Sequence, residues 1–127
     1  MPEKKKILIV DDEKDFCEMI KINLEATGKY TVRSEIHGSS TLSAVLVFKP
    51  DLILLDIAIG DMDGSQVAYE IKNSDYGKDI PIVYISGIIK LGQEHSLHNY
   101  LGGFPLLSKP IAIADLINCI EENTNKG

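Results

Sequence analysis

Short apolar runs alternate with apolar stripes of helical period along almost the whole chain. Five runs rich in Ile, Leu and Val have the length of buried strands and cover residues 7–10, 30–36, 51–57, 82–86 and 104–108. Apolar side chains recur at helical spacing after each run, at Phe16, Ile20 and Leu24, then Leu42, Val45 and Leu46, then Val67 and Ile71, then Leu97, Tyr100 and Leu101, and finally Ile113, Leu116, Ile117 and Ile120. The pattern predicts five strands that alternate with five helices.

Residues that end regular structure stand between these elements. Gly28 follows the first helical stripe, and Pro50 closes the second. The fourth helix, over residues 90–101, is expected to end at Gly102 and Gly103. Strict alternation of short buried strands with helices favours an α/β fold, with a doubly wound parallel sheet that carries helices on both faces.

Polar residues follow the predicted strands at the edge where such folds bind ligands. Asp11 and Asp12 end the first run, Asp56 belongs to the third, Ser86 ends the fourth and Lys109 follows the fifth. Two carboxylates about 5 Å apart repel by roughly 3 kcal/mol at an effective dielectric near 20, and three pairs of them would strain a small domain. The acidic residues therefore predict a divalent cation at this edge.

Composition excludes several other classes of protein. The chain has 127 residues, a formal charge of −6 and 44% apolar residues, which indicates one globular domain over residues 1–127 that does not itself contact nucleic acid. No apolar stretch approaches the roughly 20 residues of a membrane span. The charged start of the chain lacks the pattern of a secretory signal, so a cytoplasmic location is expected. Cys17 and Cys119 are expected to be buried free thiols.

Four motifs stand in order at the ends of four predicted strands, ILIVDDE, DLILLDIAIGDMDG, IVYISG and LSKP. Together they resemble the receiver domain of two-component response regulators, and the resemblance covers essentially the whole chain. It implies a flavodoxin-like fold with a five-stranded parallel sheet of order 2-1-3-4-5 and five helices. It also implies a single receiver domain without an output domain in this chain.

The resemblance implies specific chemistry at the strand ends. Asp56 would accept a phosphoryl group from a phosphohistidine, with Mg²⁺ to neutralise the charge. Asp12 and Asp56 would bind the ion directly, Asp11 through water, and the backbone carbonyl of Ala58 would complete the protein ligands. The domain would be a phosphoacceptor and not an enzyme acting on a separate substrate.

The same resemblance implies how a phosphoryl group would be sensed. Lys109 and the hydroxyl of Ser86 would each bind a phosphoryl oxygen, and the Lys109–Pro110 bond would be cis. The partners would be a sensor histidine kinase or a phosphotransfer protein, and a downstream protein or a fused output domain. The sequence leaves homodimer formation open.

The chain departs from the family pattern in ways that keep two alternatives open. Leu106 stands where receivers commonly have an aromatic residue that moves with the serine, which favours an interaction module that works without phosphorylation. A phosphatase of the haloacid dehalogenase type would need a second aspartate where this chain has Ala58. Ala58 and Ile88 cannot orient a water molecule, so slow autodephosphorylation is expected.

Overall fold

The computed structural model describes residues 3–87 and 100–125. Its strands are β1 (Lys5–Val10), β2 (Tyr30–Glu35), β3 (Leu52–Asp56), β4 (Ile82–Ser86), β5 (Tyr100–Leu101) and β6 (Phe104–Ser108). Its helices are α1 (Lys14–Glu25), the short 3₁₀ helix η1 (Gly38–Ser40), α2 (Thr41–Phe48), α3 (Gly64–Lys72) and α4 (Ile113–Thr124). The alternation predicted from the sequence is confirmed over these elements.

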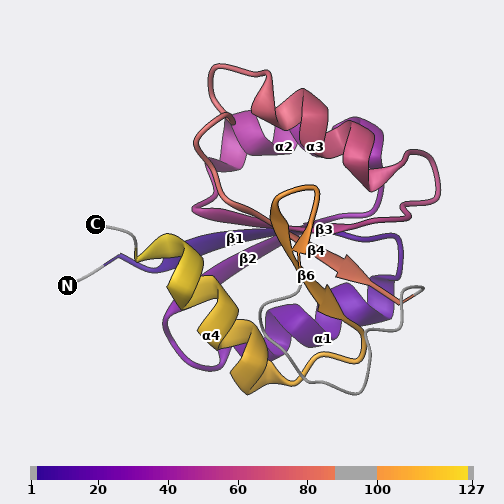
Figure 1. Cartoon of the computed structure of the whole chain (residues 1–127). Helices are drawn as coiled ribbons and strands as arrows, with labels where there is room; N and C mark the ends of the chain where they lie inside the picture. The colour runs from indigo at the N-terminus through magenta and orange to yellow at the C-terminus, as the bar shows by residue number, and fades with distance from the viewer. Residues whose placement is uncertain (1–2, 88–99, 126–127) are drawn as a thin grey trace.

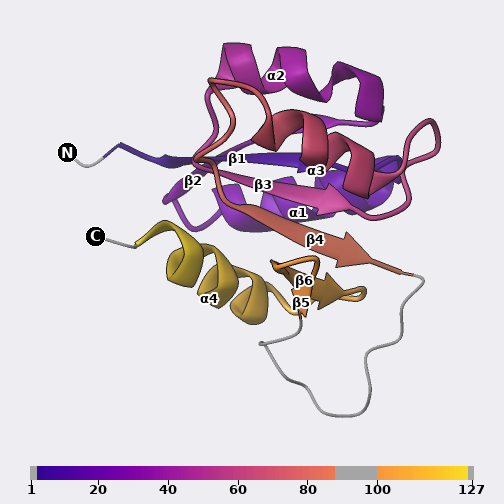
Figure 2. The same cartoon turned by 45° about the horizontal axis from the view of Figure 1, so that its top comes forward.

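The strands form one sheet in the order β2-β1-β3-β4-β6-β5 (Figures 1 and 2). Every pairing from β2 to β6 is parallel, and this part of the sheet has the predicted order 2-1-3-4-5. Helices α2 and α3 lie on one face of the sheet, whereas α1 and α4 lie on the other (Figure 1). The doubly wound α/β fold is confirmed.

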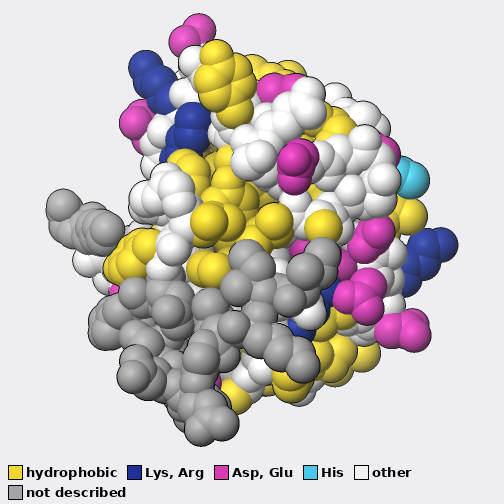
Figure 3. All heavy atoms as spheres, turned by 45° about the vertical axis from the view of Figure 1, so that its right-hand side comes forward, with side chains coloured by type: hydrophobic (Ala, Val, Ile, Leu, Met, Phe, Trp, Pro, Cys, Tyr) yellow, Lys and Arg dark blue, Asp and Glu magenta, His cyan; other side chains and the backbone are white. Residues whose placement is uncertain are grey.

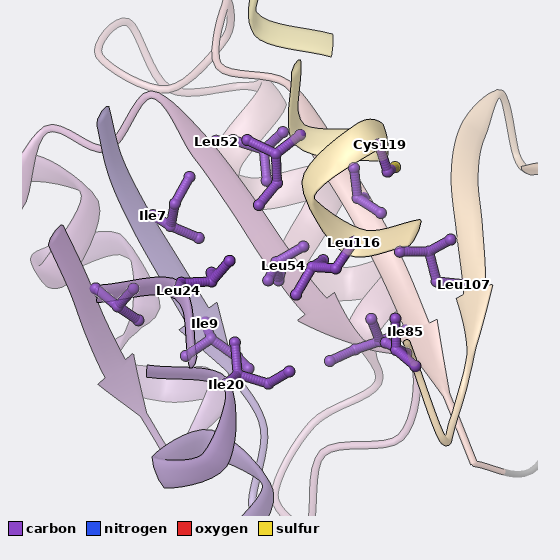
Figure 4. Packing of buried hydrophobic residues seen from close by; sticks show 14 of the residues in the cluster. Ile7, Ile9, Ile20, Leu24, Leu52, Leu54, Ile85, Leu107, Leu116 and Cys119 are labelled. Atoms are coloured by element: carbon purple, nitrogen blue, oxygen red, sulfur yellow. The ribbon is translucent and has the colours of Figure 1, made fainter. Parts of the chain in front are cut away.

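Alternate residues of the central strands pack into two cores, one on each face. Ile7 and Ile9 of β1 lie in the core under α1 and α4, where Leu24 and Leu116 also pack (Figure 4). Leu8 points to the other core, with residues of α2 and α3. Because both faces are covered, the central strands can be apolar at every position, as the sequence runs indicated.

The predicted fourth helix is wrong at its end. Tyr100 and Leu101 form β5, which pairs antiparallel with the start of β6. Gly102 and Gly103 both have positive φ, 58° and 87°, as a two-residue type I′ hairpin turn requires, so they reverse the chain instead of ending a helix. The rest of the predicted helix, including Leu97, lies outside the described residues.

Two further expectations concern the thiols and the membrane. Cys17 and Cys119 are buried and free, as predicted. Burial raises the pKa of Cys17 to about 12 and that of Cys119 to about 11, so both stay protonated at neutral pH.

In the described part of the chain, no helix combines the length and the apolar character that crossing a membrane requires.

Candidate functional site

Three carboxylates meet at the carboxyl ends of β1 and β3. Strand β1 pairs with β3 so that Val10 lies beside Leu55, which brings the residues after Val10 level with Asp56. One oxygen from each of Asp11, Asp12 and Asp56 lies within 4.8 Å of the other two. The structure thus assembles the acidic cluster that the sequence predicted. Figure 3 shows acidic side chains gathered on this side of the molecule.

Asp11 is the most enclosed of the three, with no exposed surface. Its Oδ1 accepts a hydrogen bond of 2.8 Å from the backbone N–H of Glu13, which fixes the carboxylate against the turn into α1. Its Oδ2 forms an ion pair with Nζ of Lys109 at 2.8 Å, and the described residues provide no other partner for this oxygen. A carboxylate oxygen has two lone pairs, so Oδ2 can accept a second partner beside the ammonium.

Asp56 ends β3 and is only 6% exposed. Burial raises its pKa to about 6, the N–H of Ala58 opposes this by donating to Oδ1 at 3.1 Å, and the charge of Asp11 adds to the rise. Lys109 favours the ionised form only weakly, because its Nζ is 3.8 Å from Oδ2 of Asp56. A cation bound beside Asp56 would therefore favour its ionised form.

Lys109 reaches the cluster from the end of β6. Its backbone N–H donates to the carbonyl of Ser86 at 2.8 Å, which ties β6 to β4, and the Lys109–Pro110 bond is cis as predicted. Burial alone would lower the pKa of Lys109, but its contacts with Asp11 and Glu13 outweigh burial and raise it. The side chain stays charged at the edge where the carboxylates meet.

Ser86 is buried at the end of β4. Asp56 pairs with Ile85 in the sheet, so Ser86 stands one position further along the neighbouring strand. The structure brings Ser86, Lys109 and the acidic cluster to one edge, as the sequence predicted from their positions after strands.

The loop after β3 is shaped by backbone contacts around Asp61 and Gly64. A Cβ on Gly64 would lie 2.3 Å from the carbonyl oxygen of Asp56, so only glycine lets α3 begin this close to β3. The carboxylate of Asp61 accepts hydrogen bonds from the N–H groups of Gly38 at 2.7 Å and Ser39 at 3.1 Å, which lower its pKa. Asp61 thus shapes the loop and joins it to η1, just before α2.

Comparison with known proteins decides the family. The family model described as "Response regulator receiver domain" matches residues 7–121 of this chain. The chain belongs to the response regulator receiver family. Its fold, its strand-end carboxylates and its lysine are those that the motifs indicated.

Relatives of this receiver domain differ in length. The polar-differentiation response regulator DivK of Brucella anthropi is 29% identical over 118 residues, which cover 92% of this chain and 94% of DivK. The DNA-binding dual master transcriptional regulator RpaA of Synechocystis is 28% identical over 117 residues, 88% of this chain but 46% of RpaA. A protein-glutamate methylesterase/protein-glutamine glutaminase of Clostridium acetobutylicum is 33% identical over 115 residues, 85% of this chain and 31% of that protein. The receiver thus spans less than half the length of two of these relatives.

Solved structures agree with the fold. A two-component response regulator from Clostridium difficile is 30% identical with a TM-score of 0.80, and the match covers 97% of this chain and 98% of that one. A response regulator structure from Chloroflexus aurantiacus has a TM-score of 0.82 at 22% identity, covers 98% of this chain and 100% of that one, and supports the fold alone. The domain is a signalling domain of two-component systems.

The donor set of this receiver fits Mg²⁺. It consists of carboxylate oxygens only, which that ion prefers. The buried Oδ2 of Asp11 has the ammonium of Lys109 as its one partner among the described residues, which leaves it a second lone pair for a cation. Asp12 is exposed, so the cluster is open to solvent on one side and an ion could keep water ligands there.

Two features near the site escaped the sequence analysis. Glu13 contacts Nζ of Lys109, and the ring centroid of Phe16 lies 4.3 Å from the same atom. The sequence signal for them was their position: Glu13 directly follows the acidic pair, and Phe16 lies in the first turn of α1. Their positions in the sequence did not indicate that both residues contact Lys109.

The position of the expected aromatic residue is filled by aliphatic packing. Leu106 is buried and pairs with Tyr84 across β4 and β6. Phe104 packs edge-to-face on Tyr84, with the ring centroids 5.6 Å apart and the planes at 81°. An aromatic pair thus lies beside Leu106, and its Tyr84 stands two residues before Ser86 on β4. Ile88, which the expectation of slow autodephosphorylation also used, lies outside the described residues.

Proposed function

We propose that Asp56 is the phosphoacceptor of this receiver domain and that a phosphohistidine is its donor. The observation that supports this most directly is the grouping of a buried Asp56 with Asp11, Asp12 and the ammonium of Lys109 at one edge of the sheet. A carboxylate is a covalent phosphoryl acceptor whose own charge opposes the reaction, so the site has to supply positive charge. Lys109 is one source of that charge.

In the proposed reaction an oxygen of Asp56 attacks phosphorus. The bond between phosphorus and the imidazole nitrogen of the donor breaks, a bond between phosphorus and the Asp56 oxygen forms, and the imidazole leaves with the electron pair. The N–H of Ala58 holds Oδ1 of Asp56 at 3.1 Å, which leaves Oδ2 to act as nucleophile. Lys109 and Ser86 would bind phosphoryl oxygens of the product.

Asp11, Asp12 and Asp56, with the backbone carbonyl of Ala58, would hold Mg²⁺. When bound, the ion supplies charge neutralisation at the phosphoryl oxygens. The oxygen donors and the free lone pair on Asp11 support this assignment.

The proposed signal is a change in the protein-binding surface of the domain. A phosphoryl group adds nearly two negative charges and several acceptor oxygens at the strand ends, and Ser86 and Lys109 connect that point to β4 and β6. The partners would be a sensor histidine kinase or a phosphotransfer protein upstream, and a target protein or a fused output domain downstream. We also propose that residues 1–127 form one receiver domain, that it acts in the cytoplasm, and that it catalyses no reaction on a separate substrate.

The test is the mass of the protein after incubation with phosphoramidate and Mg²⁺. The wild type should gain one phosphoryl group, and neither Asp56→Asn nor the wild type in EDTA should gain it. Asp51→Asn is the matched control, because Asp51 stands just before β3, at its opposite end, and should not affect the gain. No gain by the wild type would favour the module that works without phosphorylation.

A further inference from the structure

Lys109 has more acidic partners than chemistry at Asp56 requires. Its Nζ lies 2.8 Å from Oδ2 of Asp11 and contacts a carboxylate oxygen of Glu13, whereas Oδ2 of Asp56 is 3.8 Å away. A distance of 3.8 Å is longer than a hydrogen bond. In this structure the ammonium is held by the segment between β1 and α1, and not by the proposed phosphoacceptor.

The side chain of Glu13 makes no other hydrogen bond or ion pair among the described residues. It stands at the N-cap of α1, yet its side chain makes no capping hydrogen bond. Its backbone N–H donates to Oδ1 of Asp11, so the turn that fixes Asp11 also fixes the start of the Glu13 side chain. The ring of Phe16 completes the arrangement, because its centroid is 4.3 Å from Nζ of Lys109, within the range of a cation–π contact.

We propose that Glu13 is a positioning residue that holds Lys109 in the unphosphorylated domain and competes with the phosphoryl group for it. The inference rests on the proposed phosphorylation of Asp56. A phosphoryl group there offers several strong acceptors, so the ammonium would exchange Glu13 for a phosphoryl oxygen while Asp11 remains its partner. The exchange makes and breaks no covalent bond.

Exposure sets the size of the effect. The side chain of Glu13 is 63% exposed, whereas that of Asp11 is fully buried. An ion pair open to water is weak and is screened by salt, so Glu13 can release the lysine easily and Asp11 cannot. Glu13 is therefore suited to bias the lysine toward the unphosphorylated position without locking it there.

The test compares Glu13→Gln with Asp15→Asn, which removes the same charge from the first turn of α1. Asp15 forms no ion pair with Lys109 among the described residues. The rate of phosphorylation by phosphoramidate with Mg²⁺ is followed by mass at low and at high ionic strength. We expect Glu13→Gln to react between about 1.5-fold and 5-fold faster than the wild type at low salt, and this advantage to shrink at high salt.

Each other result decides against the proposal. If Glu13→Gln reacts at the same rate as the wild type, the contact has no effect on Lys109. If it reacts at the same rate as Asp15→Asn, only the net charge of the domain matters. A slower rate would show that Glu13 presents the lysine to the phosphoryl group instead of withholding it. If the wild type itself gains no phosphoryl group, the proposed function is overturned and this inference with it. All the other results require a wild type that is phosphorylated, so the two kinds of failure can be told apart.

Discussion

Replacing Asp56 by asparagine should stabilise the metal-free domain at neutral pH. Burial raises the pKa of Asp56 from 3.8 to about 6, and the charge of Asp11 adds to this effect. The folded state therefore binds the proton of Asp56 more tightly than the unfolded state does. The resulting stabilisation is complete below pH 3.8 and is lost as the pH rises through about 6. Asparagine has the same shape and carries no charge at any pH.

The size of the effect follows from the difference between the two pKa values. A rise of about two pH units corresponds to roughly 3 kcal/mol, at about 1.4 kcal/mol for each unit. Of this, about 2 kcal/mol should appear between about pH 7.5 and pH 4.5. Asp56→Asn should thus gain about 2 kcal/mol in free energy of unfolding relative to the wild type as the pH is raised over this interval.

Urea denaturation in EDTA at both pH values measures this difference. Subtraction of the wild type removes the titration of all groups that the two proteins share. Mg²⁺ should then stabilise the wild type at about pH 7.5 and narrow its difference from Asp56→Asn, because a bound cation replaces the missing proton. The reasoning is refuted if the two proteins differ equally at both pH values, or if the variant is the less stable one at neutral pH.

The remaining predictions concern the packing and charge around the site. Gly64→Ala should lose roughly 2 kcal/mol of stability in urea and most of its phosphorylation, since its Cβ would meet the Asp56 carbonyl at 2.3 Å. Gly87→Ala is the matched control and should leave both nearly unchanged, since its Cβ would be 3.6 Å from Lys109 Cδ. Gly103→Ala should cost about 1 kcal/mol in urea from its positive φ, because no atom of the described residues lies within 4 Å of the added atom. Lys109→Met should cost about 3 kcal/mol in EDTA by leaving buried carboxylates unpaired, and Mg²⁺ should restore part of the loss.

Much of the site could be predicted because parallel strands share a polarity. The apolar runs before Asp11 and Asp56 mark strands that are buried on both faces, and the carboxyl ends of such strands meet at one edge. The acidic cluster follows from that rule and from sequence position alone. Ser86 and Lys109 reach the same edge for the same reason.

Other parts depend on geometry that the pattern does not contain. Tyr100 and Leu101 fit a helical stripe as well as a strand. They form a strand because the hairpin turn at Gly102 and Gly103 pairs them with the start of β6. The partner of Glu13 lies 96 residues away in sequence and is reached through one backbone hydrogen bond that sets the turn after β1. A contact of that kind needs the register of the sheet and the path of the turn together.

The hairpin of β5 and β6 has a consequence for behaviour at high concentration. Without β5, the start of β6 would be an open edge strand, whose unpaired N–H and C=O groups can pair with another chain. Tyr100 and Leu101 occupy the backbone of its first residues, and Pro105 has no N–H to offer. Beside these first residues, an approaching chain meets a strand of only two residues, which is too short to template a growing aggregate.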